Sequence, residues 1–125
     1  MVQETYVSYE VAKSLREKGF NEMCPMYYNH KKQLVNLYDS DVYVPLHNSK
    51  AKKGIYSAPT HQMVMKWLRE EHEIIIIILH GIDSPMDNGW VCAIQNNGKN
   101  NFLDTVCSYE AAVEKGIEYS LKNII

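Results

Sequence analysis

The sequence predicts an α+β protein of one domain, in which an antiparallel or mixed β-sheet of about 4–5 strands packs with three helices. Three observations lead to this prediction. Apolar residues recur at helical spacing in three stretches, five consecutive isoleucines stand in the middle, and helices and strands do not alternate along the chain. The length of 125 residues suits one hydrophobic core. We therefore expect a single domain covering residues 1–125.

The first predicted helix spans residues 8–19. Ser8 can accept a backbone hydrogen bond as the N-cap, Glu10 suits the positive helix start, and Gly19 can take the left-handed conformation just beyond the end. Phe20 is expected to fold back onto the helix. Three apolar residues share one face of it: Val11, Ala12 and Leu15.

Two runs of β-type residues follow, at 34–38 and 42–46. The acidic segment 39–41 between them is a natural hairpin connection. Pro45 lacks an N–H group, which favours an edge position for the second run. Residues 47–54 then form a polar loop with three lysines: Lys50, Lys52 and Lys53.

The strongest helix signal covers residues 59–72. Pro59 suits a first helical turn, and four apolar residues fall on one face: Met63, Val64, Trp67 and Leu68. The run that follows, residues 74–79, consists of five β-branched isoleucines and Leu79, and it favours a strand that is buried on both faces. We expect this strand to be central. Helices of the same chain or a second subunit, in a homo-oligomer, would cover it.

The last third of the chain predicts two strands and a helix. Residues 90–95 alternate as a strand does, and Asn97-Gly98 is a strong turn signal leading into a third strand at 102–106. The final helix, residues 108–123, begins with Ser108 as N-cap. Its apolar stripe at helical spacing consists of Tyr109, Val113, Ile117 and Leu121.

Composition limits the classes of partner. The net charge of −2 gives no reason to expect general nucleic-acid binding or attraction to anionic membranes. The longest apolar run is far shorter than the ~20 residues that cross a bilayer. The first residues lack the basic and apolar pattern of a secretory signal. We expect a cytoplasmic protein without a membrane partner.

Patterns for catalysis or metal binding are weak. The five histidines are scattered, and two that share the 59–72 helix, His61 and His72, would stand about 16 Å apart along it. Three isolated cysteines suggest reduced thiols: Cys24, Cys92 and Cys107. No phosphate-binding or nucleophile motif is present. We expect no metal, no cofactor and no catalysis. The alternative is a small enzyme that uses Cys107 or a histidine.

Two groups of residues suit an anionic ligand. One surrounds the start of the 59–72 helix, where free N–H groups and the helix dipole favour a phosphate or carboxylate. Its members are Tyr56, Thr60, His61, Gln62, Lys66 and Arg69. The other is the basic patch of Lys50, Lys52 and Lys53, which tyrosines flank. Cations beside rings suit nucleotides, which offer phosphates and flat bases. Ordinary helix capping and a solvated lysine loop are the structural alternatives.

Three strings carry a resemblance to a protein family. The first is Tyr6-Val-Ser-Tyr-Glu-Val-Ala-Lys13 with Leu15 and Glu17-Lys-Gly-Phe20. The second is Ala58-Pro-Thr-His-Gln-Met-Val-Met-Lys-Trp-Leu-Arg-Glu-Glu-His72. The third is Ser108-Tyr-Glu-Ala-Ala-Val-Glu114 with Tyr119-Ser-Leu-Lys-Asn-Ile-Ile125. These strings are similar to small accessory proteins of Bacteroides-type phages and prophages. The resemblance implies a phage accessory protein that acts in the cytoplasm of a bacterial host. It implies no activity that can be carried over residue by residue.

This context shapes the expected function. We expect a non-enzymatic binding protein, an anti-defence protein that sequesters a nucleotide-derived immune signal. This expectation is an analogy from context rather than from a motif. The alternative is a protein–protein inhibitor that blocks a host enzyme or defence protein through an exposed apolar or aromatic patch.

Overall fold

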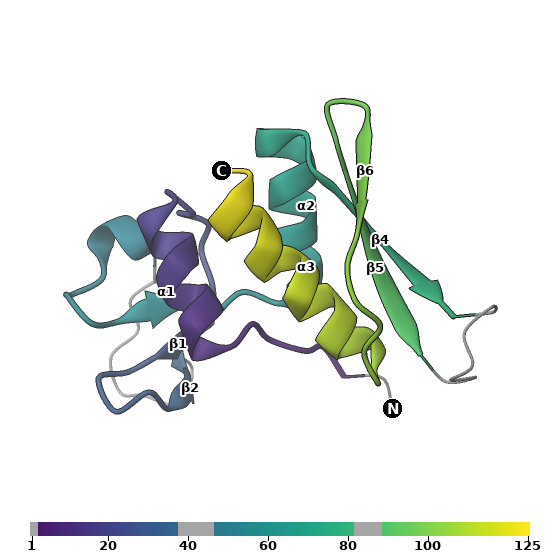
Figure 1. The fold of residues 1–125 in the computed structure, drawn as a ribbon. Helices are drawn as coiled ribbons and strands as arrows, with labels where there is room; N and C mark the ends of the chain where they lie inside the picture. Colours follow the sequence, from purple (N-terminus) through teal and green to yellow (C-terminus); the bar gives the residue numbers. More distant parts are fainter. Residues whose placement is uncertain (1–2, 38–46, 82–88) are drawn as a thin grey trace. The chain divides into compact units, whose positions relative to one another are not determined.

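The computed structural model describes residues 3–37, 47–81 and 89–125 (Figure 1). The chain divides into two compact units, Met1–Thr60 and His61–Ile125. We describe each unit by itself. Helices and strands together make an α+β protein, as the sequence predicts, but the described strands form two three-stranded antiparallel sheets instead of one sheet of 4–5 strands. That the whole chain is one domain stays a prediction.

The first unit combines one α-helix with a small sheet. Its elements are α1 (Tyr9–Glu17), β1 (Met26–Tyr28), β2 (Leu34–Asn36), the short 3-10 helix η2 (Asn48–Lys50) and β3 (Tyr56–Ser57). The strands lie in the order β2-β1-β3, and both pairings are antiparallel. The predicted hairpin partner at 42–46 and its turn at 39–41 lie outside the described residues. The described part of β2 pairs with β1, a short strand that the sequence analysis did not predict.

Helix α1 forms as its sequence predicts. The Ser8 hydroxyl accepts a hydrogen bond from the Val11 N–H at 3.3 Å. Gly19 has a φ of +91°, the left-handed conformation that ends the helix. The Phe20 N–H then donates to the Leu15 carbonyl at 2.9 Å. Both side chains are buried, so the chain turns back onto the apolar face of α1.

The second unit is a helix pair on a three-stranded sheet. Its elements are α2 (His61–His72), β4 (Ile75–His80), β5 (Trp90–Asn96), β6 (Lys99–Phe102) and α3 (Tyr109–Asn123). The strands lie in the order β4-β5-β6. Helices α2 and α3 contact each other and lie on one side of this sheet (Figure 1).

Close packing between α3 and the sheet organises the core of the second unit. Gly116 of α3 lies directly against Cys92 of β5 and beside Ile76 of β4. Ile76, Cys92 and Ile94 are buried on this face of the sheet. Side chains from both helices complete the core: Val64, Trp67, Leu68, Ala112, Val113, Ile117 and Leu121. The absence of a side chain at Gly116 therefore sets how closely α3 approaches the strands.

The structure corrects three predictions in this unit. Strand β4 stands at an edge of the described sheet, not at its centre, and the side chains of Ile75, Ile77 and Leu79 on one of its faces are exposed. The third strand begins at Lys99, directly after the turn, and not at Phe102. Helix α2 begins at His61, two residues after Pro59, because the backbone of Thr60 forms a bridge with that of Tyr6. The Asn97-Gly98 turn is confirmed, since both residues have positive φ.

Candidate functional site

Residues 47–55 of the first unit, which we call the lysine loop, are fixed by polar contacts at their start. The buried Asn48 donates from its Nδ2 to the Phe20 carbonyl at 2.8 Å, and its Oδ1 accepts from the Ser57 N–H at 2.9 Å. The Ser49 N–H donates to the Asn21 side chain at 2.8 Å. A buried amide with both ends bonded orients its backbone strongly. The lysine loop therefore has a defined path beside the end of α1.

Arg16 holds the other half of the lysine loop. Its Nη1 donates to the carbonyl oxygens of Lys52 at 3.0 Å and Ile55 at 2.6 Å, and its Nη2 donates to that of Ala51 at 3.0 Å. These bonds use three of the five N–H groups of the guanidinium. The backbone carbonyls of residues 51, 52 and 55 face the Arg16 guanidinium, and the lysine side chains of this segment extend into solvent. Both Lys52 and Lys53 are exposed.

Three tyrosines form an aromatic cluster beside the loop. The ring of Tyr9 contacts those of Tyr28 and Tyr56 edge to face, with centroids 5.7 and 5.6 Å away. Cations stand over two of the rings: Lys32 Nζ is 5.0 Å from the Tyr9 centroid, and the Arg16 guanidinium carbon is 5.8 Å from that of Tyr56. The cluster joins α1, β1 and β3.

The loop and the cluster border an open groove, which we call the Arg16 groove. It has a volume of about 320 Å³ and is lined by Arg16, Glu17, Lys53, Gly54 and Tyr56. A second groove of about 390 Å³ lies on the Asn21 and Asn48 side of Arg16. Gly54 has a φ of +87°, and a Cβ there would lie 2.8 Å from His30 Nδ1. Both the backbone conformation and the space at this position therefore require glycine.

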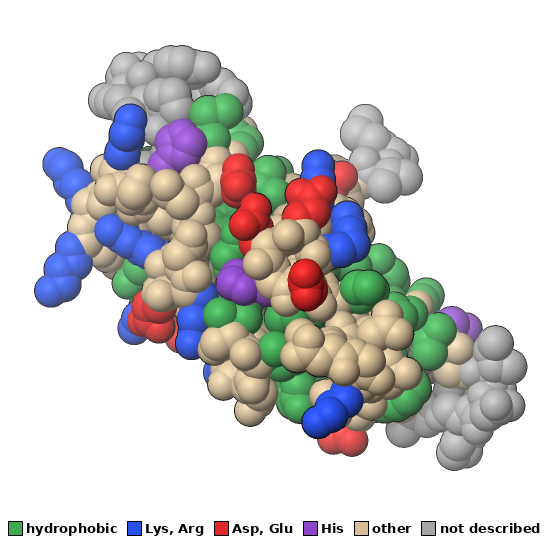
Figure 2. Space-filling view, turned by 90° about the horizontal axis from the view of Figure 1, so that it is seen from above, with side chains coloured by type: hydrophobic (Ala, Val, Ile, Leu, Met, Phe, Trp, Pro, Cys, Tyr) green, Lys and Arg blue, Asp and Glu red, His purple; other side chains and the backbone are tan. Residues whose placement is uncertain are grey.

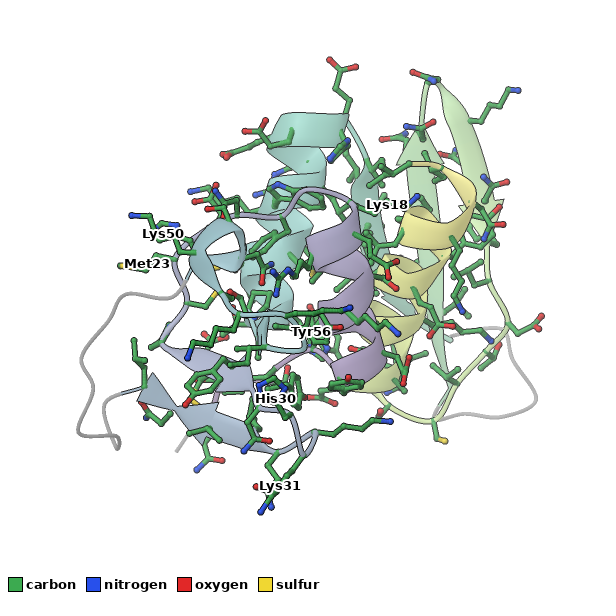
Figure 3. The ribbon with its side chains drawn as sticks, turned by 90° about the vertical axis from the view of Figure 1, so that its left-hand side faces the viewer. Lys18, Met23, His30, Lys31, Lys50 and Tyr56 are labelled. Carbon is green, nitrogen blue, oxygen red and sulfur yellow. The ribbon has the colours of Figure 1, made fainter. Side chains whose placement is uncertain are left out.

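Positive charge gathers around the Arg16 groove. Residues 1–60 contain eight lysines and arginines against six acidic residues, whereas residues 61–125 contain five against nine. Lysine and arginine side chains are prominent over the first unit in the space-filling view (Figure 2). Figure 3 faces the same unit, with Tyr56 between Lys18 and His30 in this view and Lys50 at the upper left, near Met23.

The structure distributes the predicted ligand residues over the two units. Tyr56 and Thr60 belong to the first unit, whereas His61, Gln62, Lys66 and Arg69 belong to α2 of the second. Gln62, Lys66 and Arg69 are exposed. His61 is buried, and its Nε2 lies 2.6 Å from Glu114 Oε2 in α3. The structure brings together one residue from each predicted group: Tyr56 of the ligand group and Lys53 of the basic patch line the same groove.

Sequence reasoning missed Arg16, Glu17, Gly54 and Tyr9. Arg16 stands 35–39 residues from the carbonyls that it binds, so no local pattern links them. Gly54 was the one available signal, because a glycine within a lysine-rich loop suggests a backbone position that only glycine suits.

The cysteines differ in their surroundings. Burial raises the pKa of Cys24 to about 12, with the nearby Glu22 carboxylate as a further cause, and burial raises the pKa of Cys92 to about 11. These two thiols stay protonated at neutral pH and are poor nucleophiles. Cys107 is exposed.

The described residues contain neither a metal-binding cluster nor a helix that could cross a membrane. Nowhere in 3–37, 47–81 and 89–125 do three His, Cys, Asp or Glu side chains gather as a metal ion would require. The longest described helix, α3, has 15 residues, and no described helix meets the length and apolarity that a membrane crossing needs.

Comparison with protein-family models, with curated proteins and with solved structures finds no match to this chain. The Arg16 groove is therefore the part of the described structure whose chemistry bears on function.

Proposed function

We propose that this protein binds a small nucleotide-derived anion in the Arg16 groove and that it performs no chemistry on it. The observation that carries the proposal is the meeting of a cation, an aromatic ring and a lysine around one groove of about 320 Å³. This volume lies at the lower end of the range for small-molecule sites, which is roughly 300–1,000 Å³.

Each lining residue suits one part of such a ligand. The contacts of Arg16 with the lysine loop leave two guanidinium N–H groups for phosphate oxygens, and Lys53 adds a mobile positive charge. Tyr56 offers a ring for a base, although its Tyr9 and Arg16 contacts occupy part of it. Glu17 can accept hydrogen bonds from a sugar hydroxyl or an exocyclic amine. Lysines at 50 and 52 raise the local positive potential.

The biological context of the proposal comes from the resemblance to phage and prophage accessory proteins. In that context the protein acts in the cytoplasm of a bacterial host. The ligand is then a nucleotide-derived immune signal, and binding removes it from the host defence that responds to it. The grouping of basic residues on the first unit supports an anionic ligand of this kind.

A thermal-shift panel of cyclic dinucleotides and ADP-ribose derivatives tests the proposal. A ligand that binds the native protein alone stabilises it by about 2.7 kcal/mol at a concentration of 100 times its Kd. We expect at least one member of the panel to raise the Tm. A flat response across the panel would reject a nucleotide-derived ligand.

Charge-reversal variants then locate the site. We expect Lys53→Glu to abolish the Tm shift, because it places a carboxylate where phosphate oxygens would bind. Lys99→Glu is the matched control, since Lys99 is an equally exposed lysine on β6 of the other unit. It should leave the shift unchanged. Equal loss in the two variants would mean that the response follows net charge rather than the groove.

A further inference from the structure

Strand β4 presents an edge with which no other described strand pairs. Its six residues pair with β5 along one side, from Ile75 with Gln95 to His80 with Trp90. On the other side no described strand pairs with it, and within residues 3–37, 47–81 and 89–125 no backbone hydrogen bond outside the β4–β5 pairing involves residues 75–80. A strand edge carries a row of N–H and C=O groups that can pair with another chain.

The same strand also exposes an apolar stripe. Ile75, Ile77 and Leu79 are 40%, 39% and 46% exposed, on the face opposite the helices. On that face Ile77 lies opposite Ala93, and Ala93 lies opposite Phe102 of β6. Within the described part of the second unit no helix covers this face, whereas α3 packs against the other (Figure 1).

The two edges of this sheet differ in their protection. Proteins guard exposed edges with charged residues, prolines, bulges or very short strands. Strand β6 begins with Lys99 and continues with two asparagines, so it follows this rule. Strand β4 reads Ile-Ile-Ile-Ile-Leu-His and has none of these features among its six residues. An unprotected apolar edge of this length indicates a strand that is paired in the working state.

We infer that β4 pairs antiparallel with β4 of a second copy of this chain, so that two three-stranded sheets join into one of six strands. Antiparallel partners that lie directly opposite point to the same face. A register centred on Ile77 therefore pairs Ile75 with Leu79, Ile76 with Ile78, and Ile77 with itself. Every one of these five positions meets an isoleucine or a leucine.

The strand itself points to a second copy as the occupant. A two-fold axis needs a self-complementary patch, and the exposed stripe of Ile75, Ile77 and Leu79 is symmetric about Ile77 in both size and polarity. Shifting the register by one residue would turn the exposed stripe toward the helix side. A strand of six residues is about 20 Å long. Pairing along it buries an area at the small end for protein interfaces, below roughly 1,200 Å² in total, so the dimer is reversible and depends on concentration.

Sedimentation equilibrium of the full chain over a range of concentrations tests the inference. We expect the mass to rise from one copy to two, and Ile77→Lys to hold it at one copy at the same concentrations. Phe102→Lys is the control, because Phe102 is 66% exposed on the same face but stands on the other edge strand. It should keep the dimer. A wild-type chain that stays monomeric up to millimolar concentration overturns the inference, even if β4 binds some other protein. Loss of the dimer in both variants would indicate face-to-face packing and would equally overturn it.

Cysteine crosslinking keeps the test decisive if Ile77→Lys fails to fold. In a Cys107→Ser background, Ile77→Cys should form an intermolecular disulfide under mild oxidation, because opposed Cβ atoms lie about 4.5–5.5 Å apart. Ile75→Cys should not, since its two copies would stand about 13 Å apart in this register. Efficient crosslinking through position 75, or none through position 77, would overturn the register and with it the inference.

Discussion

Arg16 is the side chain on which the path of the lysine loop most depends. Its guanidinium binds three carbonyl oxygens of residues 51–55. The Ile55 N–H also donates to the Lys52 carbonyl at 3.1 Å, but Arg16 is what ties this segment to α1. Hydrogen bonds from a charged donor contribute more to stability than neutral ones, about 1.5–3 kcal/mol each before solvent exposure reduces the value. Lysine lacks the planar fork that binds several carbonyls at once.

We expect Arg16→Lys to lower the free energy of unfolding by about 1–3 kcal/mol, measured by urea denaturation. Hydrogen exchange should rise at the amides of residues 51–55, which lose their anchor. Lys13→Ala provides the comparison, because Lys13 is exposed on the same helix. A change of less than about 0.5 kcal/mol, similar to that of an ordinary surface substitution, would show that other contacts fix the loop.

Contacts of this kind limit what could be predicted about the candidate site. Tyr56 and Lys53 could be predicted as site residues because aromatic residues and clustered lysines can be recognised directly in the sequence. It could not find Arg16 or Glu17, because helix residues with charged side chains are common and the partners of Arg16 lie more than thirty residues away. Chain order alone does not show which helix end meets which loop.

Helix α3 packs unusually closely against strand β5, at Gly116. A glycine inside a helix normally costs about 0.5–1 kcal/mol relative to alanine. Gly116 is nevertheless buried in the middle of α3, where an added Cβ would overlap the Cys92 sulfur and touch Ile76. The close approach of helix and strand therefore outweighs helix propensity at this position.

Gly116→Ala should consequently destabilise the protein, by about 1–3 kcal/mol, although the same change in an exposed helix would stabilise it. Introducing Gly116→Ala together with Cys92→Ala removes the sulfur that the new methyl group meets. In that background the alanine should be neutral or stabilising. Additive effects of the two substitutions, measured by denaturation in a double-mutant cycle, would contradict this account of the contact.

Elements that carry their own local signals were the ones predicted well. Helices α1 and α3 each have a serine N-cap that the structure confirms, at Ser8 and Ser108. The Asn97-Gly98 turn also has a local signal, since both residue types tolerate positive φ, and the structure confirms it. Sheet order has no such signal. Five isoleucines show no alternation between faces, so their sequence could not reveal that Ile77 is exposed while Ile76 is buried, or that β4 stands at an edge.

The two compact units of the chain, which meet in the sequence at Thr60 and His61, also differ in net charge. The first unit carries the lysine loop and the Arg16 groove, whereas the second carries most of the acidic residues and β4, an edge strand of the described sheet. The two proposals therefore concern different parts of the chain. Ligand binding requires the first unit, and pairing of copies requires the second, so either can fail without the other.

A fragment of residues 61–125 tests whether this division is also a division in folding. The fragment contains α2, α3 and the sheet of β4, β5 and β6, which contact one another and share a buried core. Its length falls in the range of about 55–65 residues, in which many domains fold alone but are only marginally stable. We expect it to give a dispersed NMR spectrum and cooperative thermal unfolding. The same fragment with Val113→Asp should be unfolded, because Val113 is fully buried in that core. A disordered wild-type fragment would show that the second unit needs residues 1–60, and it would favour the single domain that the sequence predicts.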